Sequence, residues 1–143
     1  MSNIHHLRAV AQGAGRWNAW RKSQPNLLPD LERADLRGAD LSGADLRGVN
    51  LAGANMEEAN VAGANLEGAN LAGAYLLHAN FSGCNLRRVN LAGEQLVGKA
   101  LLSGADLSGA MLAGGRALLG ARLSGANLSR ANLGPVRICA RQT

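Results

Sequence analysis

The chain has 143 residues, enough for one domain, and 47% of them are hydrophobic although only 3% are aromatic. Its formal net charge is +5, yet the stretch 29–135 holds all 10 acidic residues and nine basic ones, a net charge of −1 between basic ends. The opening MSNIHHLRAV has no long apolar run and the two cysteines offer no disulfide framework, so we expect a cytoplasmic protein without a membrane segment.

Residues 4 to 23 are predicted to be helical. Gly13 and Gly15 weaken the middle, so the segment is either one kinked helix or two short ones, and Pro25 ends it. A nucleic-acid platform of tryptophans and arginines is a less favoured use of this segment than a structural one. The residues that recur at helical spacing are Ile4, Leu7, Ala11, Ala14, Trp17 and, one turn further, Trp20.

From residue 29 to residue 98 a leucine, or a close substitute, recurs at every fifth position without a slip. A small residue stands two places earlier, aspartate or asparagine one place earlier, and usually glycine two places later. This period fits neither an α-helix nor a flat strand, because both would turn some of the leucines towards water. It fits a chain that turns a corner once per pentad, so that every leucine points at a common axis.

The pentads ADLRG (34–38), ADLSG (39–43), ADLRG (44–48) and ANLEG (64–68) match the motif A(D/N)LXX. In this the chain resembles the pentapeptide repeat family. The resemblance implies an all-β fold, a right-handed quadrilateral β-helix of about five coils stacked at about 4.8 Å, each coil made of four pentads. With the helical segment, the predicted organisation is a cap and linker in 1–28, the β-helix in 29–135 and a tail in 136–143. Solenoids need terminal caps, so we expect Trp17 and Trp20 to cover the first coil.

The repeat count slips by one residue at Lys99 and again near Gly115. We expect each extra residue to form a small bulge at a corner, so that the four-sided stack continues. Distributing the pentads over four faces in rotation then places Leu36, Met56 and Leu76 on one face, which we call face 2.

Two charged residues, Glu94 and Arg116, replace alanine at the inner small position of face 2 in consecutive coils, each beside a slip. We expect them to form an ion pair at or under the wall of the coil, where each charge needs the other. The alternative is a different local register, with Ala117 as a centre, in which both charges face water.

Face 2 also carries outward apolar residues in its later coils, with His78 and Lys99 at the nearby corner. Such a stripe marks a contact surface more often than an accident, so we take it as the candidate binding site. The alternative is a set of unrelated surface apolar residues. The stripe consists of Tyr75, Leu77, Val97 and Leu119.

The last residues, VRICARQT (136–143), are too short for a second helical cap, and Val136 and Ile138 alternate like an edge strand. An open coil end invites pairing with a second copy. Some members of the family that the chain resembles dimerise through this end, so a homodimer through the C-terminal end is one prediction.

No reaction chemistry is visible, and we expect neither an enzyme nor a cofactor or metal site. His5 and His6 diverge on a helix, and Cys84 takes an inner small position where it should be inert. Consecutive pentads lie on different faces, so four aspartates that recur with the repeat cannot converge. They are Asp30, Asp35, Asp40 and Asp45.

The sequence therefore favours a non-catalytic structural scaffold, a rigid rod that presents flat faces to a protein partner. The resemblance implies an alternative, because some pentapeptide repeat proteins mimic duplex DNA with an acidic rod, bind DNA gyrase or related topoisomerases and protect them from inhibitors. That role needs a strongly negative surface, whereas 29–135 is near neutral. Direct nucleic-acid binding through the basic ends is disfavoured, and would show as salt-dependent retention on DNA.

Overall fold

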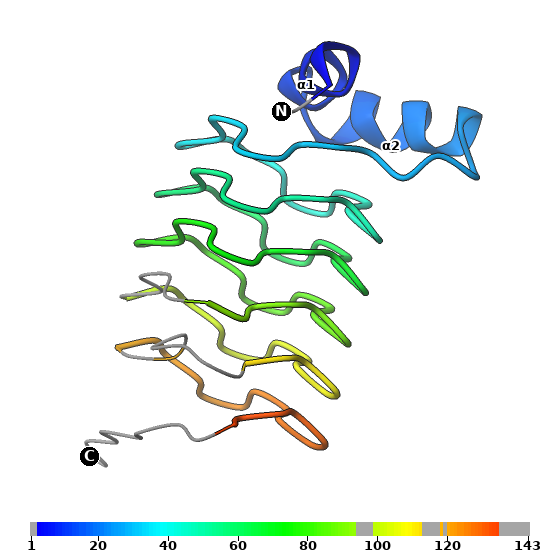
Figure 1. Cartoon of the computed structure of the whole chain (residues 1–143). Coiled ribbons are helices and arrows are strands. Elements are labelled where there is room, and N and C mark those ends of the chain that lie inside the picture. The colour runs from blue at the N-terminus through cyan, green and yellow to red at the C-terminus, as the bar shows by residue number, and fades with distance from the viewer. Residues whose placement is uncertain (1–2, 94–98, 113–117, 119, 135–143) are drawn as a thin grey trace.

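A computed structural model of the chain describes residues 3–93, 99–112, 118 and 120–134. Two helices, α1 (Ile4–Ala11) and α2 (Ala14–Ser23), lie against one end of a stack of coils (Figure 1). The helices meet at Gly13, whose φ of 89° is accessible mainly to glycine, and α2 ends two residues before Pro25. Of the two predicted arrangements, the pair of short helices is therefore the one that forms.

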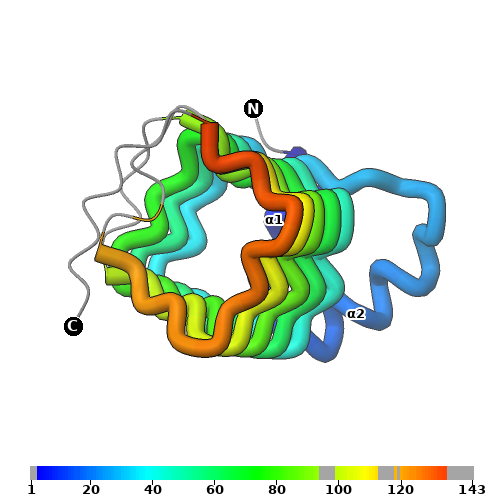
Figure 2. The backbone as a smooth tube through the Cα atoms, turned by 90° about the horizontal axis from the view of Figure 1, so that it is seen from below, coloured from blue at the N-terminus to red at the C-terminus, as the bar shows by residue number. Residues whose placement is uncertain are grey.

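The coils are joined by parallel β-bridges between residues 20 positions apart. Asp30 pairs with Asn50, Asn50 with Asn70 and Asn70 with Asn90. This offset confirms that four pentads make one coil, and Figure 2 shows the resulting four-sided outline along the axis. The right-handed winding implied by the resemblance stays a prediction.

Each face is a ladder of stacked bridges, and we number the faces by these ladders. Face 1 runs through Asp30, Asn50, Asn70, Asn90, Met111 and Asn132; face 2 through Asp35, Asn55 and Tyr75; face 3 through Asp40, Asn60, Asn80, Leu101 and Arg122; face 4 through Asp45, Asn65, Asn85, Asp106 and Asn127. These ladders agree with the rotation of pentads expected from the sequence.

The residue types of the repeat follow from the hydrogen bonds of one pentad. The backbone N–H of Leu31 donates to the carbonyl of Asn50 at 2.7 Å, which links neighbouring coils. The side-chain oxygen of Asn50 accepts from the N–H of Ala52, two residues on, at 3.2 Å, so asparagine or aspartate here stabilises the turn. The corner residue that follows has a positive φ, 65° at Gly53, which explains the recurrent glycine.

The central leucines and the small residues before them fill a continuous interior. Leu66 is 0% exposed and Ala64 is 1% exposed, which confirms the inward assignment of both positions. The last described coil differs, because its central leucines are only partly buried. These are Leu118, Leu123, Leu128 and Leu133.

Both slips in the repeat count are absorbed without loss of register on faces 1, 3 and 4. Asn80 bridges to Leu101 and Leu101 to Arg122, each an offset of 21 instead of 20. One extra residue per coil has therefore been accommodated, as predicted. The two slips fall at or beside residues 94–98 and 113–117, which lie outside the described part of the chain.

Candidate interaction surfaces

The first coil is closed by side chains from the two helices. Trp17 is 0% exposed, and its indole Nε1 donates to the carbonyl of Asp45 at 2.7 Å. Trp20 is partly buried, with its ring centroid 5.0 Å from that of Trp17. The structure thus places both predicted cap residues against the coil, where Trp17 is fully buried and Trp20 is partly buried.

Polar residues that sequence reasoning did not single out take part in the same contact. The side-chain amide of Asn18 donates to the carbonyl of Gly43 at 3.1 Å and accepts from the N–H of Asp45 at 2.7 Å. Its oxygen therefore replaces the carbonyl that a preceding coil would have offered to Asp45, as Ala44 offers its carbonyl to Asn65. The signal that could have found it is its position directly after the buried Trp17.

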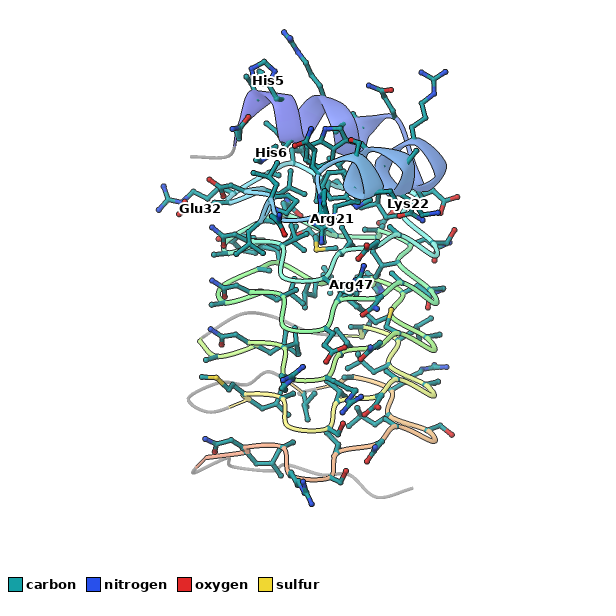
Figure 3. All side chains as sticks on the ribbon, turned by 90° about the vertical axis from the view of Figure 1, so that its right-hand side faces the viewer. His5, His6, Arg21, Lys22, Glu32 and Arg47 are labelled. Atoms are coloured by element: carbon teal, nitrogen blue, oxygen red, sulfur yellow. The ribbon has the colours of Figure 1, made fainter. Side chains whose placement is uncertain are left out.

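Arg21 is the second of these residues, and Figure 3 shows it between α2 and the first coil. Its guanidinium donates to the carbonyls of Leu27 at 3.0 Å and Arg47 at 2.7 Å, and its side chain is 10% exposed. Burial lowers the pKa of Arg21, partly offset by the charge of Asp45. Arg21 thus connects the linker after α2 to the edge of the coil.

The helical face that packs on the coil is also shifted from the predicted one. Ile4 is 56% exposed and Ala11 is exposed, whereas His6 and Val10 are 7% and 3% exposed. His6, Val10 and Trp17 form their own helical stripe in the sequence, and the polar histidine concealed it. The predicted stripe was therefore correct at Leu7, Ala14, Trp17 and Trp20, which pack against the interior, and wrong at Ile4 and Ala11.

The described part of the predicted stripe lies on face 2. Tyr75 is 51% and Leu77 is 38% exposed, and both flank the buried Leu76. The backbone N–H of Tyr75 donates to Ala54 at 2.9 Å, so the stripe stands on a hydrogen-bonded ladder. Val97 and Leu119 lie outside the described residues, so the stripe beyond Leu77 stays a prediction.

The corner that follows face 2 is occupied by non-glycine residues in three successive coils. Glu58, His78 and Lys99 have φ values of 59°, 59° and 61°, in the left-handed region that costs an L-residue about 1–2 kcal/mol. The corner that follows face 3 holds glycine at the equivalent places, including Gly63, Gly83 and Gly104. Among the described residues, the corner after face 2 thus holds three such side chains, the corner after face 4 holds two, Arg88 and Arg130, and the corner after face 1 holds one, Arg33.

Charged side chains on faces 2 and 4 are paired along the coil. Arg37 donates from Nε and from one terminal nitrogen to the two carboxylate oxygens of Asp35, each at 2.8 Å, and this bond lowers the pKa of Asp35 to about 2. Arg47 and Asp45 repeat the arrangement at 2.8 and 2.7 Å. Such exposed pairs contribute little to stability, but they neutralise each other on the surface.

A family model described as pentapeptide repeats, with 8 copies, matches residues 30–68 and 54–93. A solved pentapeptide repeat protein from the thylakoid lumen of Arabidopsis thaliana is 30% identical, with 76% of this chain and 69% of that chain covered and a TM-score of 0.33. The chain belongs to the pentapeptide repeat family.

Two other solved structures are similar to this chain by sequence and coverage. Rfr23, a pentapeptide repeat protein from the cyanobacterium Cyanothece 51142, is 32% identical over 65% of this chain and 63% of that chain, with a TM-score of 0.31. Full-length QnrB1, a plasmid-mediated fluoroquinolone resistance protein, is 27% identical over 76% of this chain and 62% of that chain, with a TM-score of 0.35. The chain thus spans only 62–69% of the length of these three proteins. No curated protein matches the chain.

The remaining predicted sites of this pentapeptide repeat protein are placed as follows. Glu94 and Arg116 lie outside the described residues, so their ion pair stays a prediction. Cys84 is 1% exposed, its Sγ donates to the carbonyl of Val61 at 2.8 Å, and burial raises the pKa of its thiol to about 12. At neutral pH it is therefore a buried thiol and not a thiolate nucleophile.

No three histidine, cysteine, aspartate or glutamate side chains within 3–93, 99–112, 118 and 120–134 come together in a way that could hold a metal ion. Neither α1, with 8 residues, nor α2, with 10, has the length and apolarity needed to cross a membrane.

Proposed function

We propose that this pentapeptide repeat protein is a non-catalytic scaffold that binds a protein partner through face 2. The observation that carries the proposal is the outward placement of Tyr75 and Leu77 on a rigid ladder, where they are 51% and 38% exposed. Two apolar residues exposed side by side on one face favour a contact role. The proposed surface extends to Val97 and Leu119, which stand at the equivalent outward positions of the next two coils by sequence.

The corner beside these residues supports the same surface. Glu58, His78 and Lys99 keep positive φ values where glycine would be unstrained. Strain of this kind persists mainly where a side chain has a use. All three can reach a partner that is seated on Tyr75 and Leu77, because they stand at the edge of the same face.

The test is an affinity capture with matched variants, using the full chain as bait. Leu77→Glu places a charge in the proposed surface, and Ala72→Glu places the same charge at the equivalent outward position of face 1. We expect the captured partner to be lost with Leu77→Glu and kept with Ala72→Glu, while both variants keep the wild-type melting curve. Equal retention by both variants would refute the assignment to face 2. The triple variant Leu77→Glu, Val97→Glu, Leu119→Glu then tests whether the stripe extends beyond Leu77.

A second candidate function is the protection of DNA gyrase or a related topoisomerase by mimicry of DNA, which membership of the family brings to this chain. The similarity to QnrB1, a fluoroquinolone resistance protein, favours it. The surface charge counts against it, because Arg37 and Arg47 neutralise the aspartates beside them and the stretch 29–135 has a net charge of −1. A gyrase supercoiling assay with an inhibitor present decides between the two functions, because only the DNA mimic would restore activity.

Four further assignments belong to this proposal. Residues 1–28 act as the cap, with Trp17 and Trp20 shielding the end of the interior, 29–135 as the interaction body and 136–143 as the tail. A homodimer through the C-terminal end is supported by the partly buried leucines of the last described coil, such as Leu128 and Leu133. The scaffold needs no cofactor and is not an enzyme. A cytoplasmic location is proposed, although one similar structure comes from a thylakoid lumen.

A further inference from the structure

The contact between α1 and the coil depends on an imidazole that acts as a hydrogen-bond acceptor. The backbone N–H of Asp30 donates to Nδ1 of His6 at 2.9 Å, and the neighbouring bond runs from the N–H of Asn3 to the carbonyl of Asp30 at 3.1 Å. Together these two bonds satisfy both backbone groups of Asp30, the first residue of the ladder on face 1. Because Nδ1 accepts, the proton of the neutral ring must be on Nε2.

His6 is enclosed while it makes this bond. The residue is 7% exposed, and its ring lies 5.4 Å from that of Trp20, inclined by 54°. Figure 3 shows His6 between α1 and the first coil, whereas His5 lies on the far side of the helix. A second proton on His6 would set an N–H at Nδ1 against the N–H of Asp30, leaving two enclosed donors without an acceptor.

We propose that His6 is a pH-sensitive latch, which holds α1 on the coil when the imidazole is neutral and releases α1 when it is protonated. Histidine is the side chain that normally changes charge between about pH 5 and pH 8. The docked form requires the neutral ring and the undocked form does not, so the undocked form binds more protons. Lowering the pH therefore shifts the equilibrium towards undocking.

The charges on the elements around His6 favour the same direction. The first coil contributes five acids, of which Asp35 and Asp45 are paired with Arg37 and Arg47. One carboxylate oxygen of Asp30, whose backbone is bonded to His6, already accepts from the N–H of Glu32 at 3.0 Å and from the amide of Asn50 at 3.1 Å. The helices contribute no acid, so a new positive charge on His6 joins an excess of basic groups. The titratable and charged residues on the packed elements are His5 and Arg8 on α1, Arg16, Arg21 and Lys22 on α2, and Asp30, Glu32, Arg33, Asp35, Arg37, Asp40, Asp45 and Arg47 on the first coil.

The structure also provides a hinge for this movement. Gly13 joins the helices with φ 89° and ψ 170°, and a Cβ built on it would meet nothing within 4 Å. A cleft of about 240 Å³ lies between α1 and the coil, lined by Leu7 and Val10 on the helix and by Leu36, Leu41, Asp35, Arg37 and Asp40 on the coil. By contrast, α2 is tied to the coil through Trp17, Asn18 and Arg21 and should stay in place.

Hydrogen exchange of the full chain, measured by mass spectrometry and corrected for the intrinsic rates, tests the latch. Between about pH 8 and about pH 5 we expect the protection of residues 3–13 to fall about tenfold, while that of residues 54–68 is unchanged. In His6→Asn the side-chain oxygen can stand near the position of Nδ1 and cannot be protonated, so protection should not depend on pH. His5→Gln is the matched control and should behave as the wild type.

Two results would overturn the latch. One is a pH-dependent loss of protection in His6→Asn equal to that of the wild type, which would assign the effect to another group. The other comes from nitrogen NMR of the wild-type imidazole, which keeps the test decisive even if His6→Asn fails to dock. A charged His6 beneath a still protected α1 would show that protonation does not release the helix.

Discussion

Leu66→Ala should lower the free energy of unfolding by about 3 kcal/mol. Leu66 lies at the centre of the stack on face 4, between Leu46 and Leu86, and all three are 0% exposed. Removing such a side chain forfeits about 1.5–3 kcal/mol of transfer free energy and adds a cavity term, because the neighbouring coils are held by their ladders and cannot close the space. With an m-value of about 1.5 kcal/mol/M, the urea midpoint should fall by about 2 M.

Leu128→Ala is the matched control, since Leu128 occupies the same position of face 4 in the last described coil but is only partly buried. Urea unfolding followed by circular dichroism should show a midpoint shift for Leu128→Ala of less than half that for Leu66→Ala. Equal shifts would refute the reasoning, because stability would then not follow burial. Leu66→Asp should abolish folding altogether, and a wild-type melting curve for it would contradict the inward placement.

Four other predictions concern single groups and assembly. Arg37→Ala should raise the pKa of Asp35 from about 2 towards its ordinary value, as followed by carboxyl NMR. Because the folded state lowers this pKa, the pair's contribution is present at neutral pH and lost as the pH falls from about 4 to about 2. In a Cys139→Ser background, which removes the other thiol, Cys84 should react with a thiol reagent only after unfolding in urea, and rapid reaction of the folded protein would argue against its burial. In thermal melts, Glu94→Ala should lower the melting temperature more than Glu94→Ala combined with Arg116→Ala. Equal decreases would contradict the predicted ion pair. Size-exclusion chromatography with light scattering should give twice the mass of the 14.8 kDa chain, and the mass of one chain would exclude the C-terminal homodimer.

The coil could be predicted from the sequence because each of its features repeats. The fifth-residue period places Leu66 inside, the asparagine before each centre forms the same turn as Asn50, and the offset of 20 follows from four pentads per coil. The effect of the slips could also be predicted, because one extra residue in a coil produces the offset of 21 between the bridged residues Asn80 and Leu101. Repetition makes one local rule visible many times, which is why the register could be assigned residue by residue.

The contact between the helices and the coil could be predicted only in part. The tryptophans indicated a buried helical face. The polar residues His6, Asn18 and Arg21 could not be predicted in the same way, because they hydrogen-bond to backbone atoms, which every residue type has. Their partners are Asp30, Gly43 and Arg47. A side chain that replaces a missing coil is needed once in the chain, so no repetition reveals it. The wrong start of the predicted stripe at Ile4 has the same origin, because a buried acceptor was needed where an apolar residue was expected.

The same contrast indicates where function should be sought in a repeat of this kind. Packing determines which residues occupy the inner positions, and the turn determines the asparagine or aspartate position. A residue that differs from the repeat at these positions therefore mainly affects folding stability. A departure at a corner is different: a side chain at the position of His78 is strained by its positive φ, and glycine would relieve that strain. Three such departures in successive coils lie beside the exposed Tyr75 and Leu77, which favours a use for these side chains, just as Arg88 at a corner of face 4 forms an ion pair with Glu67. Under the proposed function, binding at face 2 would give these side chains a use, whereas the corner that follows face 3 holds glycine, including Gly63 and Gly83.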